Sequence, residues 1–173
     1  MSAKELILVR HAKSSWKNKG LDDHDRPLNE RGRRNAPEMG EKLKRQGINP
    51  DIVFTSSALR AVATAKIICE KLRFPFDQII HEAGMYHSDV SEWLGFIGGL
   101  DDQWGSVMAF GHNPGLTELV AGVWGLPVAN IPTCGVISLT FGRKVWAAAV
   151  VEGPVTASFD YPKNKFAVPE VLA

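Results

Sequence analysis

The sequence predicts an α/β protein built on a layered sheet that is mixed but mostly parallel. Short apolar runs of strand length alternate with longer segments of helical character, which is typical of βαβ units. Toward the end of the chain, three residues of turn-like composition separate two further strand-like runs, which favours an antiparallel hairpin. A length of 173 residues with 45% hydrophobic content suits a single domain over residues 1–173.

The first predicted strand covers residues 5–11 and ends in an arginine and a histidine. Four consecutive apolar residues from Leu6 to Val9 suit a strand that is buried on both faces. Ligands of parallel sheets bind beyond the carboxyl ends of the strands, where Arg10 and His11 emerge. A guanidinium can hold a phosphoryl group by two hydrogen bonds, and neutral imidazole is a nucleophile near pH 7. The pair indicates phosphate chemistry, with a solvated loop pair as the alternative.

The second strand exit carries another arginine. A helix is predicted over residues 30–46, a strand over 52–55 and a second helix over 58–72, with Ser57 as the N-cap of this second helix. Arg60 then lies in the first helical turn, where free backbone amides and the helix dipole favour an anion. We therefore consider Arg60 a phosphate ligand, the alternative being an ordinary solvated helix residue.

The third strand exit carries a second histidine. His112 follows a predicted strand over 107–111 and precedes a helix over 115–123, with Asn113 as its N-cap and Pro114 at its first position. Three strand exits thus supply histidine and arginine, the groups that an oxyanion site for phosphoryl transfer requires. The elements between the second and third exits are predicted as a strand over 78–82 and a helix over 89–99.

The C-terminal part is predicted to complete the sheet. Val136–Phe141 and Val145–Val151 are expected to be antiparallel neighbours joined by the turn at 142–144. After Gly153, three prolines resist regular structure while scattered aromatic residues allow docking. Residues 154–173 are therefore expected to form an ordered surface strap, with disorder or a dimer contact as the alternatives.

Three motifs resemble those of the histidine phosphatase superfamily, also called phosphoglycerate-mutase-like. The order of the motifs and their separations agree with that family, and the resemblance spans about residues 1–150. It implies a three-layer α/β/α sandwich of the phosphoglycerate-mutase-like kind. The three segments are Leu8-Val9-Arg10-His11-Ala12, which resembles the Arg-His-Gly signature, Ser56 through Ala65, which resembles the second arginine motif, and Gly111-His112-Asn113-Pro114, which resembles the second histidine motif.

Within the superfamily, the sequence is more similar to the SixA-like phosphohistidine phosphatases than to the mutases. The segments that carry this similarity are residues 10–16 and 26–32, the second reading Arg-Pro-Leu-Asn-Glu-Arg-Gly. Ala12 replaces the commoner glycine, a departure that this branch shares. Ser14 matches a serine that contacts substrate in mutase relatives, whereas Lys17 stands where those relatives carry asparagine. The resemblance implies a phosphorylated histidine on a signalling protein as the substrate.

The resemblance also implies a two-step mechanism without metal or other cofactor. His11 would attack phosphorus in line and form a phosphohistidine that water later hydrolyses. Arg10, Arg60 and His112 would surround the equatorial oxygens and stabilise the transition state. Asn113 is expected to bind substrate as well.

Acidic side chains that could have a functional role lie at Glu82 and in residues 22–25. Glu82 aligns with the acidic motif of the mutases and is a candidate proton donor, the alternative being a solvated carboxylate at a strand end. Phosphohistidine needs such a donor less, because its imidazole leaving group can already carry a proton. Residues 22–25 contain metal-ligand types, but four consecutive residues cannot all face one ion, so no metal is expected. The same loop could touch the substrate.

Composition narrows the range of partners. A net charge of +1 without a basic run argues against nucleic acid or an anionic membrane. No apolar run reaches the roughly 18 residues that span a bilayer. Two cysteines without an export signal predict a cytoplasmic protein, which we expect to be a monomer.

The expected substrate is a phosphorylated protein, because the intervals between the motifs leave little room for a lid over the site. A small phosphomonoester is the alternative substrate, and a broad small-molecule phosphomonoesterase or mutase is the alternative enzyme. A noncatalytic phosphoprotein-binding module is the rival from another class, although a pure binder has no need of the nucleophile His11.

Overall fold

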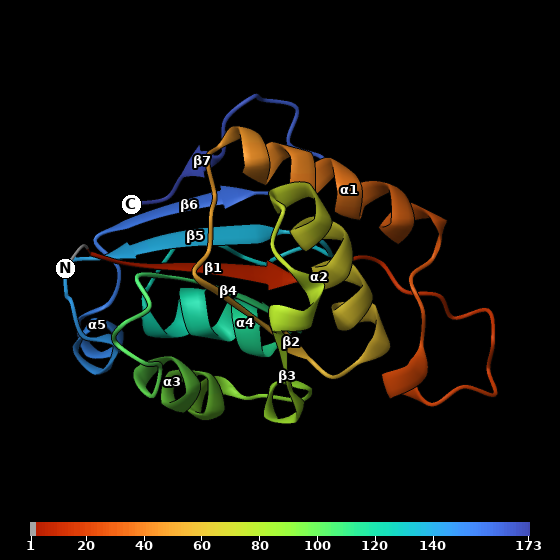
Figure 1. Cartoon of the computed structure of the whole chain (residues 1–173), viewed down its shortest axis with the longest axis horizontal. Helices are drawn as coiled ribbons and strands as arrows, with labels where there is room; N and C mark the ends of the chain where they lie inside the picture. The colour runs from red at the N-terminus through yellow and green to blue at the C-terminus, as the bar shows by residue number, and fades with distance from the viewer. Residues whose placement is uncertain (1–2) are drawn as a thin grey trace.

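The computed structural model describes residues 3–173, and their fold is a three-layer α/β/α sandwich (Figure 1). The strands of its sheet are β1 (Lys4–Arg10), β2 (Ile52–Ser56), β3 (Ile79–Glu82), β4 (Ser106–Gly111), β5 (Val136–Phe141), β6 (Thr156–Asp160) and β7 (Glu170–Val171). Their order in the sheet is β3-β2-β4-β1-β5-β6-β7. The strands from β3 to β1 are parallel neighbours, and the remaining pairings are antiparallel. The predicted α/β fold with a mixed sheet is confirmed.

Helices cover both faces of the sheet. One face carries α1 (Glu30–Arg45) and α2 (Leu59–Leu72). The other face carries α3 (Val90–Gly98), α4 (Gly115–Thr117) and α5 (Trp146–Glu152). The short helix α4 continues directly as the π-helical η4 (Glu118–Val123). Short 3₁₀ turns are η1 (Asp23–Asp25), η2 (Phe76–Gln78) and η3 (Ala83–Met85). No helix within residues 3–173 combines the length and apolar character needed to cross a bilayer.

Strand β1 lies at the middle of the sheet and is buried by both layers of helices. Leu6 and Leu8 pack into the core under α3 and α5, whereas Ile7 and Val9 pack against α1 and α2. This alternation follows from the two-residue period of a strand, and it explains why the apolar run of β1 is continuous.

The parallel pairing brings the three predicted strand exits to one edge of the sheet. In the register of the sheet, Arg10 of β1 lies opposite Gly111 of β4, and Thr55 of β2 lies opposite Phe110 of β4. The strands β2, β4 and β1 are immediate neighbours. The residues that follow each strand therefore meet at the same place, as the rule for ligand sites in parallel sheets predicts.

The predicted hairpin after β5 is wrong. The segment Val145–Val151 is helical, since α5 begins at Trp146, and the backbone N–H of Trp146 donates to Oδ1 of Asp102 at 2.8 Å. A short apolar run cannot be assigned to a strand or a buried helix by periodicity, and three consecutive alanines favour the helix. The antiparallel neighbours of β5 are β1 and β6 instead.

The predicted surface strap over 154–173 is wrong in part. Residues 156–160 form β6, which pairs with both β5 and β7. The flanking Pro154 and Pro162 lie outside the strand, where a missing N–H costs no ladder hydrogen bond. Prolines therefore bound this strand and do not prevent it.

Two predicted helix caps differ from the structure by one residue. The N-cap of α2 is Ala58 rather than Ser57, and the Ala58 N–H donates to Oγ of Ser56 at 3.3 Å. The N-cap of α4 is Pro114 rather than Asn113, whose Oδ1 still accepts the backbone N–H of Thr117 at 3.2 Å. Such shifts are common at helix ends, and they leave the site residues on the predicted corners.

Candidate active site

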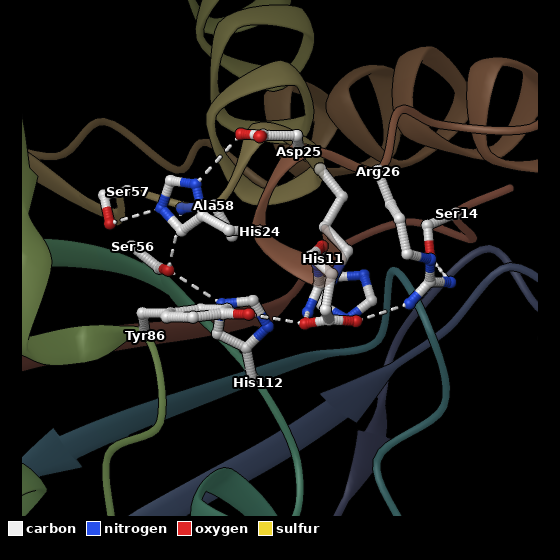
Figure 2. Close-up of polar contacts among 12 residues, drawn as sticks. His11, Ser14, His24, Asp25, Arg26, Ser56, Ser57, Ala58, Tyr86 and His112 are labelled. Atoms are coloured by element: carbon white, nitrogen blue, oxygen red, sulfur yellow. Dashed lines mark hydrogen bonds and ion pairs between the residues drawn. The ribbon is translucent and has the colours of Figure 1, made fainter. Parts of the chain in front are cut away.

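Two histidines face each other at the edge where β1, β2 and β4 end. The ring centroids of His11 and His112 are 5.0 Å apart, and the planes are tilted by 50°. Nε2 of His112 lies 2.7 Å from Oγ of Ser56, the last residue of β2 (Figure 2). The three strand ends thus contribute one side chain each to a common cluster.

The His11 ring is fixed by its own strand end. Nδ1 of His11 lies 2.7 Å from the carbonyl oxygen of Ala12, and because a carbonyl can only accept, Nδ1 carries the proton. The Ala12 N–H donates to Oγ1 of Thr64 at 2.9 Å, and this hydroxyl donates to the carbonyl of Arg60 at 2.6 Å. The arrangement leaves the lone pair on Nε2 of His11 free to act.

Both imidazoles are neutral in the free protein. Burial lowers the pKa of His11 from 6.5 to about 4, with smaller contributions in the same direction from the charges of Arg60 and Arg10 and an opposing one from the hydrogen bond to the Ala12 carbonyl. Burial also lowers the pKa of His112 to about 3, with His11 and Arg60 contributing. At pH 7 His11 is therefore a neutral base, which is the form that can attack phosphorus.

Arg10 is prepared for an anion. One terminal nitrogen, Nη1, donates to the carbonyl of Ile131 at 2.8 Å, whereas the buried Nε has no partner within residues 3–173. Burial lowers the pKa of Arg10, and the neighbouring Arg60 adds to this effect. A buried N–H without an acceptor is costly, so an oxyanion that accepted from this group would be favoured.

Arg60 and Arg26 are joined through one carboxylate, that of Asp23 in η1. Arg60 donates from Nη1 to the Asp23 carbonyl at 2.6 Å and from Nη2 to its Oδ2 at 3.0 Å. Arg26 donates from Nη1 to Oδ1 at 2.8 Å, and the hydroxyl of Tyr86 donates to Oδ2 at 2.6 Å. The hydrogen bond from Tyr86 and those from the arginines hold the pKa of the Asp23 carboxyl well below its usual range. Figure 2 draws the hydrogen bonds of Tyr86 and Arg26 as dashed lines.

Ser14 lies beside Arg26. Its buried Oγ accepts from Nη2 of Arg26 at 2.5 Å, and Nε of Arg26 donates to the carbonyl of Ser15 at 3.0 Å. The Arg26 guanidinium stacks on Trp16, 3.2 Å from the ring centroid. Ser14 therefore orients a guanidinium, a contact that the sequence did not indicate.

Glu82 is bonded to its own turn. Its Oε1 accepts the backbone N–H of Gly84 at 3.2 Å, and no hydrogen bond joins it to the two histidines within the described chain. It lines a cavity of about 220 Å³ with residues of η3 and α3, such as Met85 and Phe96. The structure therefore gives Glu82 no contact that marks it as a proton donor.

Asn113 ties two loops together. Its Nδ2 donates to Oδ1 of Asn130 at 3.0 Å and to the carbonyl of Ile131 at 2.9 Å. Its Oδ1 accepts from both the backbone N–H and the hydroxyl of Thr117. Because Ile131 also accepts from Arg10, Asn113 supports the loop that holds this arginine.

Sequence reasoning missed several residues of the cluster. Arg26 lies in a motif that marked the branch, and Asp23 lies in a loop that was expected near the substrate, but neither was assigned to the site. Ser56 and Thr64 both belong to the second arginine motif, which could have indicated them. Tyr86 had no such signal, because only the fold brings it to Asp23.

A comparison with protein families identifies the class. The protein-family model described as "Histidine phosphatase superfamily (branch 1)" matches residues 6–98, more than half of the chain. The chain belongs to the histidine phosphatase superfamily.

Curated relatives fall into two kinds. An uncharacterized chloroplastic protein of Arabidopsis thaliana is 27% identical over 169 residues, which cover 88% of this chain and 73% of that protein. A 2,3-bisphosphoglycerate-dependent phosphoglycerate mutase of Bartonella bacilliformis is 37% identical over 92 residues, or 52% of this chain and 45% of the mutase. The matched region thus spans less than half the length of that mutase.

Similar solved structures indicate the branch of the superfamily to which the chain belongs. A candidate phosphohistidine phosphatase SixA from Agrobacterium tumefaciens is 26% identical, with a TM-score of 0.73 over 82% of this chain and 94% of the other. A protein histidine phosphatase SixA in complex with tungstate is 23% identical and shares the fold, with a TM-score of 0.72 over 92% of this chain and 98% of the other. The protein is a histidine phosphatase of the SixA-like branch.

Proposed function

We propose that the enzyme removes phosphoryl groups by way of a covalent phosphohistidine on Nε2 of His11. The observation that carries this proposal is the hydrogen bond from Nδ1 of His11 to the carbonyl of Ala12. It leaves Nε2 unprotonated in a ring whose pKa of about 4 keeps it neutral at pH 7. The Nε2–P bond forms as the bond from phosphorus to the leaving group breaks. Water then attacks the phosphorus of the intermediate and releases phosphate and free His11.

Arg10, Arg60 and His112 have supporting roles in this proposal. Negative charge accumulates on the equatorial oxygens, which accept from the guanidinium of Arg60 and from Nε of Arg10, a group without a partner among residues 3–173. His112, whose ring centroid lies 5.0 Å from that of His11, donates to the same phosphoryl group. A bound dianion raises the pKa of both imidazoles, so His112 can take up a proton when the substrate arrives.

The substrate class follows from the leaving group. Glu82 is hydrogen-bonded to its own turn and not to the two histidines within residues 3–173, and Asp23 has a lowered pKa, so neither group is suited to protonate an alkoxide. A phosphohistidine leaves as imidazole, which can carry its own proton and tolerates the missing donor. The match to SixA structures supports the same substrate. We therefore propose phosphohistidine on a signalling protein as the substrate, with no metal ion required.

The test is phosphate release in the presence of a chelator, from a phosphohistidine protein and from an alkyl phosphomonoester. Wild type and His11→Ala are compared with His81→Ala, which removes an exposed histidine of β3. We expect release from phosphohistidine that requires His11 and is unchanged in His81→Ala. Release mainly from the alkyl ester would make the enzyme a broad phosphomonoesterase, and no His11-dependent release would contradict the proposal.

A further inference from the structure

The cations of the site already bind an anion that belongs to the protein. Asp23 accepts hydrogen bonds from Arg60, Arg26 and Tyr86, and both terminal nitrogens of Arg60 donate to this one residue. The ring of Tyr86, whose hydroxyl donates to Asp23, lies 5.6 Å from the ring of His112, which is 5.0 Å from that of His11, so this ion pair lies close to the two imidazoles. A phosphoryl group on His11 would need the same guanidinium.

The two partners of this ion pair differ in how firmly they are held. The Arg60 side chain is 7% exposed and extends from the first turn of α2, whereas that of Asp23 is 43% exposed. Asp23 belongs to the three-residue turn η1, which has no side-chain cap. Water reaches the Asp23 carboxylate and can replace its hydrogen bonds when it moves, whereas the Arg60 guanidinium is buried. The carboxylate can therefore leave while the guanidinium stays in place.

We propose that Asp23 occupies the anion site of the free enzyme and that an incoming phosphoryl group must displace it from Arg60. Asp23 is then a specificity-determining residue, which selects dianionic phosphoryl groups over carboxylates and other monoanions. This inference rests on the function proposed above for the same site. The hydrogen bond from the Tyr86 hydroxyl to Oδ2 of Asp23 helps to hold the carboxylate in this place and is lost when the carboxylate moves aside.

The selection follows from charge and effective concentration. A free carboxylate carries the same charge as Asp23, but it competes with a group that is tethered beside Arg60 at an effective concentration in the millimolar range or above. A phosphoryl dianion adds a second charge, and its further oxygens can accept from Nε of Arg10, which is buried and has no acceptor in the described part of the chain. Only the dianion gains enough binding free energy to displace the tethered Asp23 carboxylate.

The first experiment measures the binding of orthophosphate by calorimetry to wild type, Asp23→Asn and Asp25→Asn. Asp25 is the matched control, because it lies in the same turn and its carboxylate contacts only His24 among the described side chains. We expect Asp23→Asn to bind orthophosphate at least about tenfold more tightly than wild type, which is about 1.4 kcal/mol. Asp25→Asn should stay within about twofold of wild type, because general charge effects at exposed sites are screened.

The second experiment uses acetate as a probe of the anion site beside Arg60, which is left without a carboxylate when Asp23 is replaced by alanine. We expect acetate to bind to Asp23→Ala and to compete there with orthophosphate, and not to do so in wild type. Tyr86→Phe keeps every charge and removes one donor to Asp23, so it should tighten orthophosphate binding by about twofold to fivefold. This variant also provides the test if the Asp23 variants fail to fold, which thermal unfolding will reveal.

Unchanged or weaker orthophosphate binding in Asp23→Asn, or in Tyr86→Phe if the Asp23 variants do not fold, would overturn the proposal. Asp23 would then merely position the arginines. The binding experiments need no turnover, so they can fail while His11-dependent phosphate release succeeds. The converse result, tighter binding without any hydrolysis, would contradict the proposed function and leave the occupancy of the anion site by Asp23 intact.

Discussion

The strand ends and the η1 turn contribute to the same site in different ways. His11 is 8% exposed and its ring is fixed by a hydrogen bond to the carbonyl of Ala12, whereas the Asp23 side chain is 43% exposed and is held by two ion pairs and one tyrosine. Buried hydrogen bonds within a packed sheet persist, while half-exposed ion pairs are weak and depend on salt. The residues at the strand ends are therefore suited to phosphoryl transfer, and the η1 turn is suited to discriminating between anions.

The largest effect should come from removing a strand-end cation. Arg10→Ala deletes a guanidinium whose buried Nε awaits an acceptor, and the loss of one such donor typically lowers kcat by about 10²–10³-fold. Steady-state kinetics on the phosphohistidine protein provide the measurement. Arg143→Ala, which removes an exposed arginine paired with Glu152, is the control and should leave turnover unchanged. A loss of less than about threefold in Arg10→Ala would mean that the strand ends do not bind the phosphoryl group.

The pH dependence of stability should reflect the buried histidines. Unfolded histidine titrates near 6.5, whereas in the folded protein the pKa is about 4 for His11 and about 3 for His112. Below pH 6.5 the unfolded chain therefore takes up protons that the folded protein does not bind. The free energy of unfolding should fall by up to about 1.4 kcal/mol per pH unit for each histidine, until the folded pKa is reached.

Urea unfolding at a series of pH values tests this dependence. In His11→Gln the decline between pH 6.5 and 4 should be shallower than in wild type, because one of the two groups no longer titrates. Equal slopes in both proteins would show that His11 is protonated in the fold near its ordinary pKa.

A smaller effect is expected from Thr64, a residue of α2 that supports the end of β1 by a hydrogen bond to Ala12. Thr64→Val removes the hydroxyl that accepts from the Ala12 N–H and leaves this buried donor without a partner. The cost should be about 1–3 kcal/mol of stability. We also expect about a tenfold lower kcat with little change in KM, since Ala12, whose carbonyl holds the His11 ring, loses the hydrogen bond that fixes its own N–H. A change in KM alone would argue that Thr64 does not position the nucleophile.

The smallest effect should come from Glu82. Glu82→Gln should change phosphohistidine hydrolysis by less than about twofold, because the leaving imidazole needs no external acid. Hydrolysis of alkyl phosphomonoesters should change as little, because the Glu82 carboxylate is bonded to its own turn and not to the two histidines within residues 3–173. A selective loss on the alkyl ester would contradict this and restore Glu82 as the proton donor.

The strand ends could be predicted from the sequence because local signals specify them. The continuous apolar run of β1 identifies a central strand, and the motifs around Arg60 and His112 place these residues at helix starts. Parallel pairing then leaves one edge where the three exits can meet.

The η1 cluster could not be predicted in the same way. Asp23 binds Arg60 across 37 residues and Tyr86 across 63, and such contacts between polar side chains leave no periodic pattern in the sequence. The error at Val145–Val151 has a different origin, since a short apolar run fits a strand and a buried helix equally well.

The most direct test of the central claim is to locate the covalent phosphoryl group. The enzyme is mixed with the phosphohistidine protein, quenched in alkali, and examined by peptide mass mapping and by phosphorus NMR of the digest. We expect one phosphorylated residue, His11, with the phosphoryl group on Nε2, because Nδ1 is hydrogen-bonded to the carbonyl of Ala12. A phosphoryl group on Nδ1 or on His112, or turnover without any phosphoenzyme, would contradict the mechanism.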